Sequence, residues 1–278
     1  IPIKTNASVR TIRISASGAT LPSENDSAIF LKRIGDSITA FGQNRFWILN
    51  NGRWKVWGSP EFTLSDNNVS ALMRTNKGEI WIGYFDHGID ILNSDFILKT
   101  HLQDETLTFI NHLSSDQDGN IYISTANGFV ILGNDGVRHI YHESDGLLSD
   151  RVMQAVPLDP HGKRVAIATS QGFTLKDGSA MKSIFAFHGL INNQVYTIAA
   201  NGDQLYLGTL GGISRVRGLN VLENWTQVDS GLKRNWVNAL LTIDRNRLLV
   251  GTYGSGIQLR TESGDWMQFE ALPQDFEV

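Results

Sequence analysis

The sequence contains no cysteine. Disulfide bonds, thiolate metal ligands and cysteine nucleophiles are therefore all excluded. This absence does not identify a compartment, because a cysteine-free chain suits the cytosol and the periplasm equally well.

Long apolar runs and an excess of one charge are missing as well. No stretch approaches the roughly 18–20 apolar residues of a transmembrane helix. The net charge is −4 over 278 residues, so no general attraction to nucleic acid or anionic lipid is expected. The first ten residues lack the layout of a signal peptide and begin with Ile1, which indicates a mature or excised segment. We expect no nucleic-acid partner and no membrane span in this segment.

The dominant positive feature is an internal repeat. A strand-like segment that ends in glycine, often followed by threonine, recurs every 40 to 44 residues; its copies begin at Ile38, Ile80, Ile121, Val165, Leu205 and Leu248. Each copy contains about four short β-rich runs separated by turn residues, and helical patterns are hard to find. Four strands in each repeat of this length are typical of a β-propeller.

A second pattern separates the copies. A Gly-Leu pair stands before a valine in Gly146–Val152, Gly189–Val195 and Gly231–Val237. We interpret this pattern as the crossing from the outer strand of one blade to the inner strand of the next. The second strand of each copy is almost continuously apolar, as expected for a strand covered on both faces, and its final glycine allows neighbouring backbones to approach closely.

The sequence therefore predicts an all-β fold, a single β-propeller domain over residues 1–278. Six blades of four antiparallel strands fit the repeat best. The N-terminal segment 1–19, with the strand-like run 9–15, is expected to contribute a ring-closing strand, which would remove an exposed sheet edge. Seven blades are the alternative, because the sixth copy already has an outer strand of its own at 266–271.

The stretch NNVSALMRTNKGEIWIGYFDHGI (67–89) resembles the two-component-regulator propeller repeat. The resemblance covers nearly the whole chain and is strongest at 63–132 and 189–260; the first copy departs most, with Phe41-Gly42 where Gly-Thr is typical. It implies a ligand-sensing propeller, typically periplasmic, in bacterial signal-transduction regulators. Streptogramin lyases and other sugar-degrading lyases have similar propellers, so the resemblance fixes the fold better than the activity.

Motifs for metal or catalytic chemistry are weak. The run HIYHE (139–143) falls where an outer strand belongs, so its histidines would point to opposite faces and not form a metal pair. The run DQDGN (116–120) reads as a hairpin turn and not a calcium loop, since its glycine comes too early. We expect no metal, no cofactor and no catalytic set, although Asp86 and His87 side by side are the most enzyme-like spot.

The loops between second and third strands and the crossings are expected to emerge on the same face of a propeller. Aromatic side chains with polar neighbours on that face suit a sugar or a peptide. The candidate ligand-binding residues are Arg45, Tyr84, Phe85, Asp86, His87, Asn127, Gln171, Arg234, Trp236 and Tyr253.

Three functions fit these observations. The leading hypothesis is a non-enzymatic sensor that binds a small molecule such as an oligosaccharide. The first alternative is a scaffold that binds a protein partner. The second is a lyase that acts on a polysaccharide or cyclic peptide through His87 and a tyrosine such as Tyr253. Enzymatic activity remains open, with binding favoured.

Overall fold

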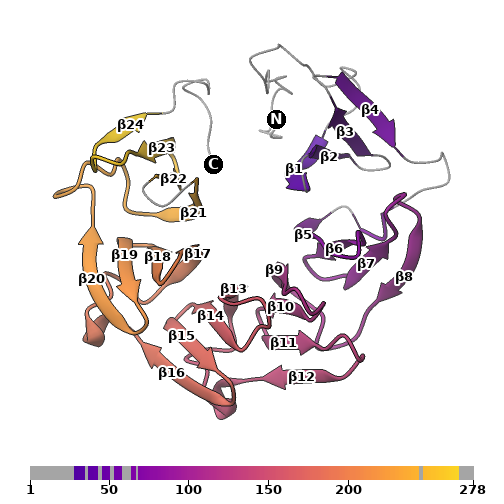
Figure 1. Ribbon diagram of the computed structural model, residues 1–278, viewed down its shortest axis with the longest axis horizontal. Coiled ribbons are helices and arrows are strands. Elements are labelled where there is room, and N and C mark those ends of the chain that lie inside the picture. Colours follow the sequence, from indigo (N-terminus) through magenta and orange to yellow (C-terminus); the bar gives the residue numbers. More distant parts are fainter. Residues whose placement is uncertain are drawn as a thin grey trace. The chain divides into compact units, whose positions relative to one another are not determined.

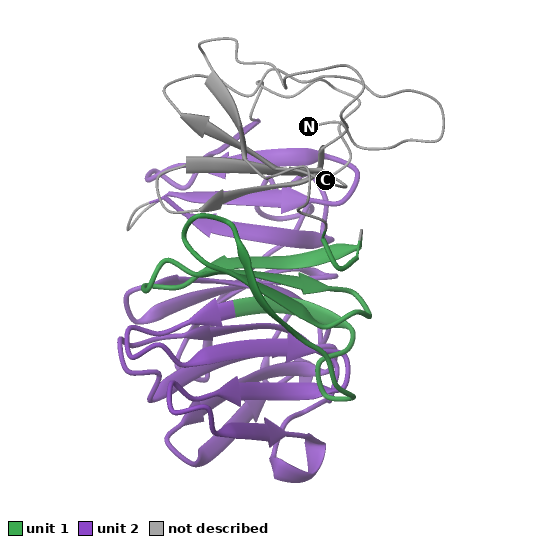
Figure 2. Ribbon diagram, turned by 90° about the vertical axis from the view of Figure 1, so that its right-hand side faces the viewer, with its two compact units in different colours: residues 1–113 green, residues 114–278 purple. Residues whose placement is uncertain are grey.

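The computed structural model describes residues 28–34, 37–42, 46–50, 53–57, 64–66, 68–243 and 247–268. For residues 28–34, 37–42, 46–50 and 53–57, the structure describes the backbone strands and their pairing alone. The predicted ring-closing run 9–15 lies outside the described residues. The chain divides into two compact units, Ile1–Leu113 and Ser114–Val278 (Figure 2).

The first unit contains two four-stranded antiparallel sheets in which each strand pairs with the next along the chain. The strands of the first sheet are β1 (Ala28–Ile34), β2 (Ser37–Gly42), β3 (Phe46–Asn50) and β4 (Arg53–Trp57). Those of the second sheet are β5 (Val69–Arg74), β6 (Ile80–Tyr84), β7 (Ile89–Leu92) and β8 (Leu98–Leu102).

The strand β9 (Ile110–Ser115) contains the boundary between the units and begins the next sheet in sequence order, which continues with β10 (Ile121–Thr125), β11 (Gly128–Leu132) and β12 (Arg138–Tyr141). Three further four-stranded sheets follow in the second unit. Their strands are β13 (Val152–Pro157), β14 (Arg164–Thr169), β15 (Gly172–Asp177), β16 (Ala180–Ile184), β17 (Val195–Asn201), β18 (Gln204–Thr209), β19 (Gly212–Arg217), β20 (Asn220–Trp225), β21 (Val237–Thr242), β22 (Leu248–Thr252), β23 (Gly256–Arg260) and β24 (Trp266–Gln268).

This arrangement confirms an all-β, propeller-like fold built from four-stranded antiparallel sheets. Burial follows the predicted order within a sheet. The second strands β6 and β10 are buried at every residue, whereas the fourth strands β8 and β12 are largely exposed. The almost continuous apolar character of the second strand thus reflects cover on both of its faces.

The Gly-Leu crossings lie where the sequence predicts, between the fourth strand of one sheet and the first strand of the next. Gly189 has φ of 98° and ends the short 3-10 turn η2 (Ala186–His188), a conformation that glycine adopts without strain. The following Leu190 is 4% exposed, and Val195, which begins β17, is fully buried. The repeated motif therefore turns the chain, inserts a leucine into the core and starts the next strand.

Within the second unit the sheets lie side by side, with β13, β17 and β21 on the inner side and β16 and β20 on the outer side (Figure 1). Hydrogen bonds join successive first strands: the Ile198 amide donates to Gln154 Oε1 at 2.7 Å, and Thr242 Oγ1 donates to the Ala200 carbonyl at 3.0 Å. A Cβ on Gly208 would lie 2.6 Å from Thr197 Cγ2 and 2.8 Å from Val237 Cγ1, so glycine is required for this approach of neighbouring sheets.

A buried polar side chain on the third strand holds several crossings in place. Asp90 on β7 accepts from the Ser65 amide at 3.0 Å, and Ser214 on β19 accepts from the Ile191 amide at 3.0 Å. Gln258 on β23 accepts from the Lys233 amide through Oε1 at 2.8 Å. These buried polar side chains thus give backbone donors of the crossing a partner within the protein.

Candidate ligand-binding loops

The loop between the second and third strands lies beside the preceding crossing in sheets of both units. A backbone amide at the end of the second strand donates to the carbonyl of the residue that precedes the first strand. These bonds are Phe85 to Asn68 (2.9 Å), Ser170 to Arg151 (3.1 Å), Leu210 to Gln194 (3.2 Å) and Tyr253 to Trp236 (3.0 Å). In each of these sheets, the predicted binding residues of the loop and of the crossing therefore share one edge.

Threonine closes this loop in most of the sheets. Thr209 Oγ1, at the end of β18, donates to the Gly212 carbonyl at 2.8 Å and accepts from the Gly211 amide at 3.0 Å. Thr125 and Thr169 make the same pair of bonds in their own loops. The Gly-Thr signature of the repeat thus fixes the short loop through a local side-chain hydrogen bond.

Tyr84 requires a correction to the predicted site. It is the last residue of β6 and is fully buried, so its ring packs in the core with Leu72 and Ile82 and not on the loop surface. Its hydroxyl donates to Asp90 Oδ2 at 2.5 Å. Burial above all, followed by the hydrogen bond and charge of Asp90, raises the pKa of Tyr84 above its usual value.

Three further candidates of the first unit, Phe85, Asp86 and His87, lie in the loop that follows β6. Phe85 is 50% exposed and packs edge to face on Phe109 of the next crossing, with ring centroids 5.2 Å apart. Asp86 is exposed. The half-buried His87 ring lies 5.5 Å from the ring of His101, whose Nδ1 is 2.7 Å from Asp90 Oδ1. The loop therefore presents an aromatic ring and a carboxylate to solvent.

An aromatic cluster stands at the corresponding edge of the second unit. Trp236 in the crossing stacks on Tyr253 in the β22–β23 loop, with ring centroids 4.5 Å apart and planes inclined by 26°. Tyr196 lies 5.9 Å from Trp236 on the side of the neighbouring sheet. Trp236 is 37% and Tyr253 50% exposed, so both rings offer surface to a ligand. We call Tyr196, Trp236 and Tyr253 the aromatic platform.

Tyr196 was not identified from the sequence. It follows Val195 at the start of β17, where the pairing with β18 shifts by one residue. This β-bulge leaves Tyr196 out of the ladder and turns its ring toward the crossing of the next sheet. The position directly after the valine of the crossing motif is the signal that could have found it.

Polar candidates accompany the platform. Arg234 is exposed, and its Nε donates to Ser255 Oγ in the loop that contains Tyr253, at 3.4 Å. Asn127 and Gln171 are exposed at the tips of the equivalent loops of their sheets. Their backbone amides donate hydrogen bonds to the hydroxyls of Thr125 and Thr169. Arg45 lies outside the described residues.

The motifs interpreted as structural occupy structural positions. His139 is exposed on the outer strand β12, and the Asp116–Asn120 turn joins β9 to β10, with Gly119 at φ of 89°. Among the described residues, no group of three or more histidine, aspartate and glutamate side chains could hold a metal ion. Within the same residues, no helix has the length and apolar character needed to cross a bilayer.

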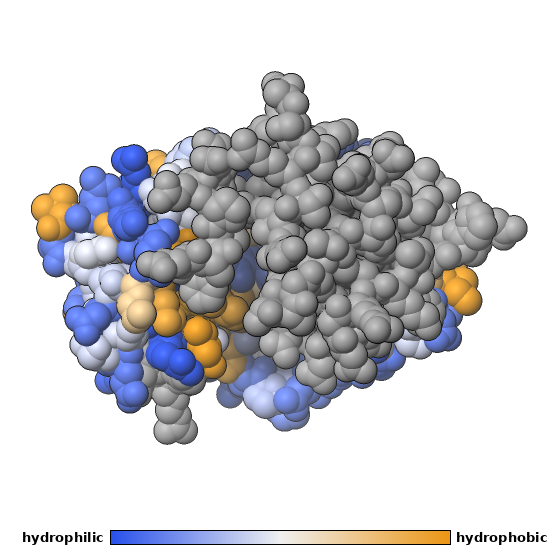
Figure 3. Space-filling model, turned by 90° about the horizontal axis from the view of Figure 1, so that it is seen from above, coloured by the Kyte–Doolittle hydropathy of each residue, from blue (hydrophilic) through white to orange (hydrophobic). Residues whose placement is uncertain are grey.

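On the described part of one side, hydrophobic residues form separate patches among hydrophilic ones (Figure 3).

Comparison with known proteins agrees with this architecture. Residues 63–86 match the family model described as "Two component regulator propeller", which confirms the resemblance seen in the sequence. The matched segment contains the strands β5 and β6. A search of curated proteins gives no match.

Solved structures show the same fold at low sequence identity. The extracellular domain of BT3049, named as a hybrid two-component system of B. thetaiotaomicron, aligns with a TM-score of 0.67 and 12% identity over 85% of this chain. The alignment covers 34% of that protein, so this chain spans about a third of its length. A streptogramin B lyase aligns with a TM-score of 0.68 and 14% identity over 94% of this chain and 88% of its own. The WD40 propeller domain of Doa1 aligns with a TM-score of 0.67 and 14% identity over 91% of this chain and 85% of its own. At these identities the likeness defines a propeller fold and no activity.

Proposed function

We propose that this chain is a six-bladed β-propeller that binds a small molecule, such as an oligosaccharide, without transforming it. The strands β1–β4 form the first blade. This blade number is supported by the six copies of the repeat and by six four-stranded sheets. The two-component-regulator repeat at 63–86 supports a sensor role, and the likeness to the BT3049 extracellular domain supports a periplasmic location.

The proposal rests chiefly on one observation, the exposed stack of Trp236 on Tyr253. Exposed aromatic rings that pack on each other form a rigid flat surface, and the apolar face of a sugar ring packs well on such a surface. The guanidinium of Arg234 supplies hydrogen-bond donors at the rim, as does the side-chain amide of Gln194, whose Oε1 lies 3.5 Å from the Tyr196 hydroxyl. Asn127 and Gln171 complete the proposed ligand-contacting residues of the second unit. Phe85, Asp86 and His87 are proposed as a separate set on the first unit, and Arg45 remains a prediction from the sequence.

Titration calorimetry against a panel of neutral oligosaccharides tests the proposal. Trp236→Ala and Tyr253→Ala should each weaken binding of the best ligand about thirtyfold, equivalent to about 2 kcal/mol. Phe187→Ala is the matched control, because Phe187 is an aromatic residue in a different crossing and is 88% exposed. It should leave the affinity unchanged.

Two outcomes would contradict the proposal. A panel that neither binds nor raises the melting temperature, with a protein partner lost in Trp236→Ala, favours the scaffold alternative. Turnover of a glycan that His87→Ala abolishes favours the lyase alternative.

A further inference from the structure

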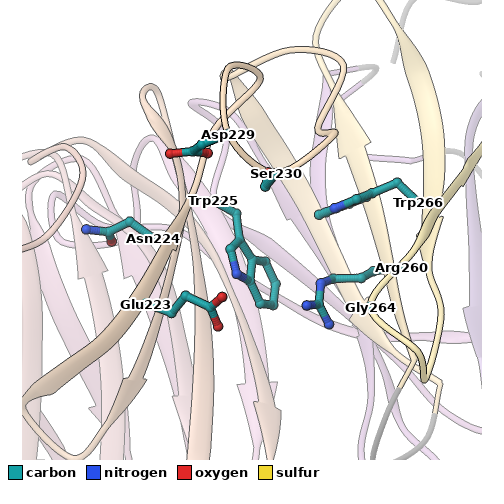
Figure 4. Close-up of a pocket in the computed structure, with 8 residues that line it drawn as sticks. All are labelled: Glu223, Asn224, Trp225, Asp229, Ser230, Arg260, Gly264 and Trp266. Carbon is teal, nitrogen blue, oxygen red and sulfur yellow. The ribbon is translucent and has the colours of Figure 1, made fainter.

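A cavity lies away from the aromatic platform, between the outer parts of the last two sheets. Its volume is about 330 Å³, at the lower end of the range for small-molecule pockets. Figure 4 shows Glu223 and Trp225 of β20 facing Arg260 and Trp266 of the neighbouring sheet, with Asp229 and Ser230 of the crossing above them. No residue of the aromatic platform lines this pocket.

Trp225 forms a rigid inner wall. It is 3% exposed and packs in the core with Leu232 and Val237. The ring of Trp266 meets it edge to face, with centroids 6.0 Å apart and an interplanar angle of 85°. Trp266 is only half-buried, so part of its ring remains available to a ligand.

Arg260 is held in position without an acidic partner. Its guanidinium Cζ lies 4.0 Å from the centroid of the Trp225 ring, a cation–π contact that orients the planar group. Among the described residues the Arg260 side chain forms no ion pair or hydrogen bond, and its buried Nε has no acceptor. A Cβ on Gly264 would lie 3.2 Å from one terminal nitrogen, so glycine leaves the edge of the guanidinium uncovered.

The acidic residues of the pocket already have partners. Glu223 Oε2 pairs with Arg215 at 2.9 Å. Asp229 Oδ1 accepts from the Thr226 hydroxyl at 2.8 Å and from the Thr226 amide at 2.9 Å. These side-chain and backbone bonds hold the pKa of Asp229 below its usual value, so it is ionised at neutral pH. The pocket thus contains one unpaired cation and two negative charges on its other walls.

We propose that this pocket binds a small monocarboxylate with a flat apolar face. The ligand carboxylate receives two parallel hydrogen bonds from the guanidinium of Arg260, the geometry in which arginine recognises planar anions. The flat face packs on the exposed part of Trp266. Ser230 Oγ donates to the Thr226 carbonyl and retains lone pairs for a ligand hydroxyl. Glu223 and Asp229 disfavour a second negative charge, so phosphate and dicarboxylates bind more weakly.

Such a ligand can be a sugar acid or an aromatic acid, and calorimetry on the whole chain distinguishes the two. The probes are sodium glucuronate and sodium phenylacetate, with methyl glucoside and phenylacetamide as their neutral counterparts and with inorganic phosphate as the dianion. We expect at least one carboxylate to bind, and its neutral counterpart and phosphate to bind at least tenfold more weakly. Binding of glucuronate alone identifies a sugar acid; binding of phenylacetate alone identifies an aromatic acid.

Variants test the role of the guanidinium. Arg260→Gln should weaken binding of the carboxylate at least tenfold, and Arg260→Lys should restore only part of it, because lysine lacks the planar fork. Arg217→Gln is the matched control, since Arg217 belongs to the adjacent sheet and pairs with Asp203 at 2.9 Å outside the pocket. Circular-dichroism melting verifies that each variant folds. If Trp266→Leu weakens binding while Arg260 is intact, the indole surface is confirmed independently.

The proposal is overturned if neither carboxylate binds, if a neutral counterpart binds as tightly as its acid, or if folded Arg260→Gln and Arg260→Lys both retain full affinity. Because these probes and variants leave Trp236 and Tyr253 unchanged, the result is independent of the proposed oligosaccharide site.

Discussion

The end of the second strand is built in two different ways in this molecule. In β18 it is Thr209, whose hydroxyl bonds only to its own loop. In β6 the equivalent residue is Tyr84, whose hydroxyl crosses to Asp90 on the next strand. The threonine fixes a loop locally. The tyrosine instead joins the loop to a network centred on the buried Asp90, which also includes Ser65 of the crossing and His101 of the outer strand.

This difference teaches that one position of the repeat can stabilise either the loop alone or the whole sheet. A local threonine bond makes the loop largely independent of the strands behind it. The network around Asp90 couples three strands and a crossing, so the loss of Asp90 should destabilise all of these elements. The following predictions test that contrast.

Replacement of the network's centre should have the largest effect. Asp90→Ala removes the acceptor for the Tyr84 hydroxyl, which is left in a fully buried environment, and for the amide and hydroxyl of the exposed Ser65. We expect a loss of about 3–4 kcal/mol in the free energy of unfolding, measured by urea denaturation. Asp86→Ala, on the exposed loop nearby, is the control and should cost less than about 0.5 kcal/mol. Equal effects of the two variants would show that Asp90 is no more than a surface carboxylate.

Removal of one hydroxyl from the network should have a smaller effect. Tyr84→Phe keeps the ring in the core and deletes only the donor to Asp90, which still accepts from Ser65. A hydrogen bond to a charged group contributes about 1.5–3 kcal/mol, so the free energy of unfolding should fall by about this amount. Urea denaturation should show it as a lower midpoint concentration. A double-mutant cycle with Ser65→Ala should show coupling, because both side chains bind the same carboxylate. Strict additivity would contradict the idea of one network.

Alkaline pH should weaken the sheets that contain buried tyrosines. Burial, followed by the hydrogen bond to an aspartate, raises the pKa of Tyr84 and of Tyr122 above the usual tyrosine value of about 10. The unfolded chain therefore loses these protons first, and the stabilisation present below pH 10 declines as the pH rises further. The loss is about 1.4 kcal/mol per pH unit for each tyrosine. Melting temperatures between pH 9 and 11 should fall less steeply in Tyr84→Phe and in Tyr122→Phe. Unchanged slopes in both variants would refute this account.

The sequence predicts the parts of this structure that repeat. Spacing of apolar runs placed the strands and crossings correctly, because every sheet must bury the same faces. It did not distinguish Tyr84 from a loop residue, since the contact with Asp90 depends on pairing between β6 and β7. Tyr196 was missed because a bulge turns it out of the ladder. Trp225 and Trp266 lie forty-one positions apart, and only the packing of two sheets brings them together.

The smallest effect is expected at the locally closed loop. Thr209→Val keeps the shape of the side chain and removes the bonds to Gly211 and Gly212, at a cost of about 1 kcal/mol. Because Thr209 bonds only within its own loop, hydrogen exchange should quicken at Gly211 and Leu210 and stay unchanged in the outer strand β20. Tyr84→Phe, by contrast, should quicken exchange at Ser65 and in β8 as well. If Thr209→Val also loosens β20, the loop is coupled to its sheet, and the contrast between the two ways of ending the second strand fails.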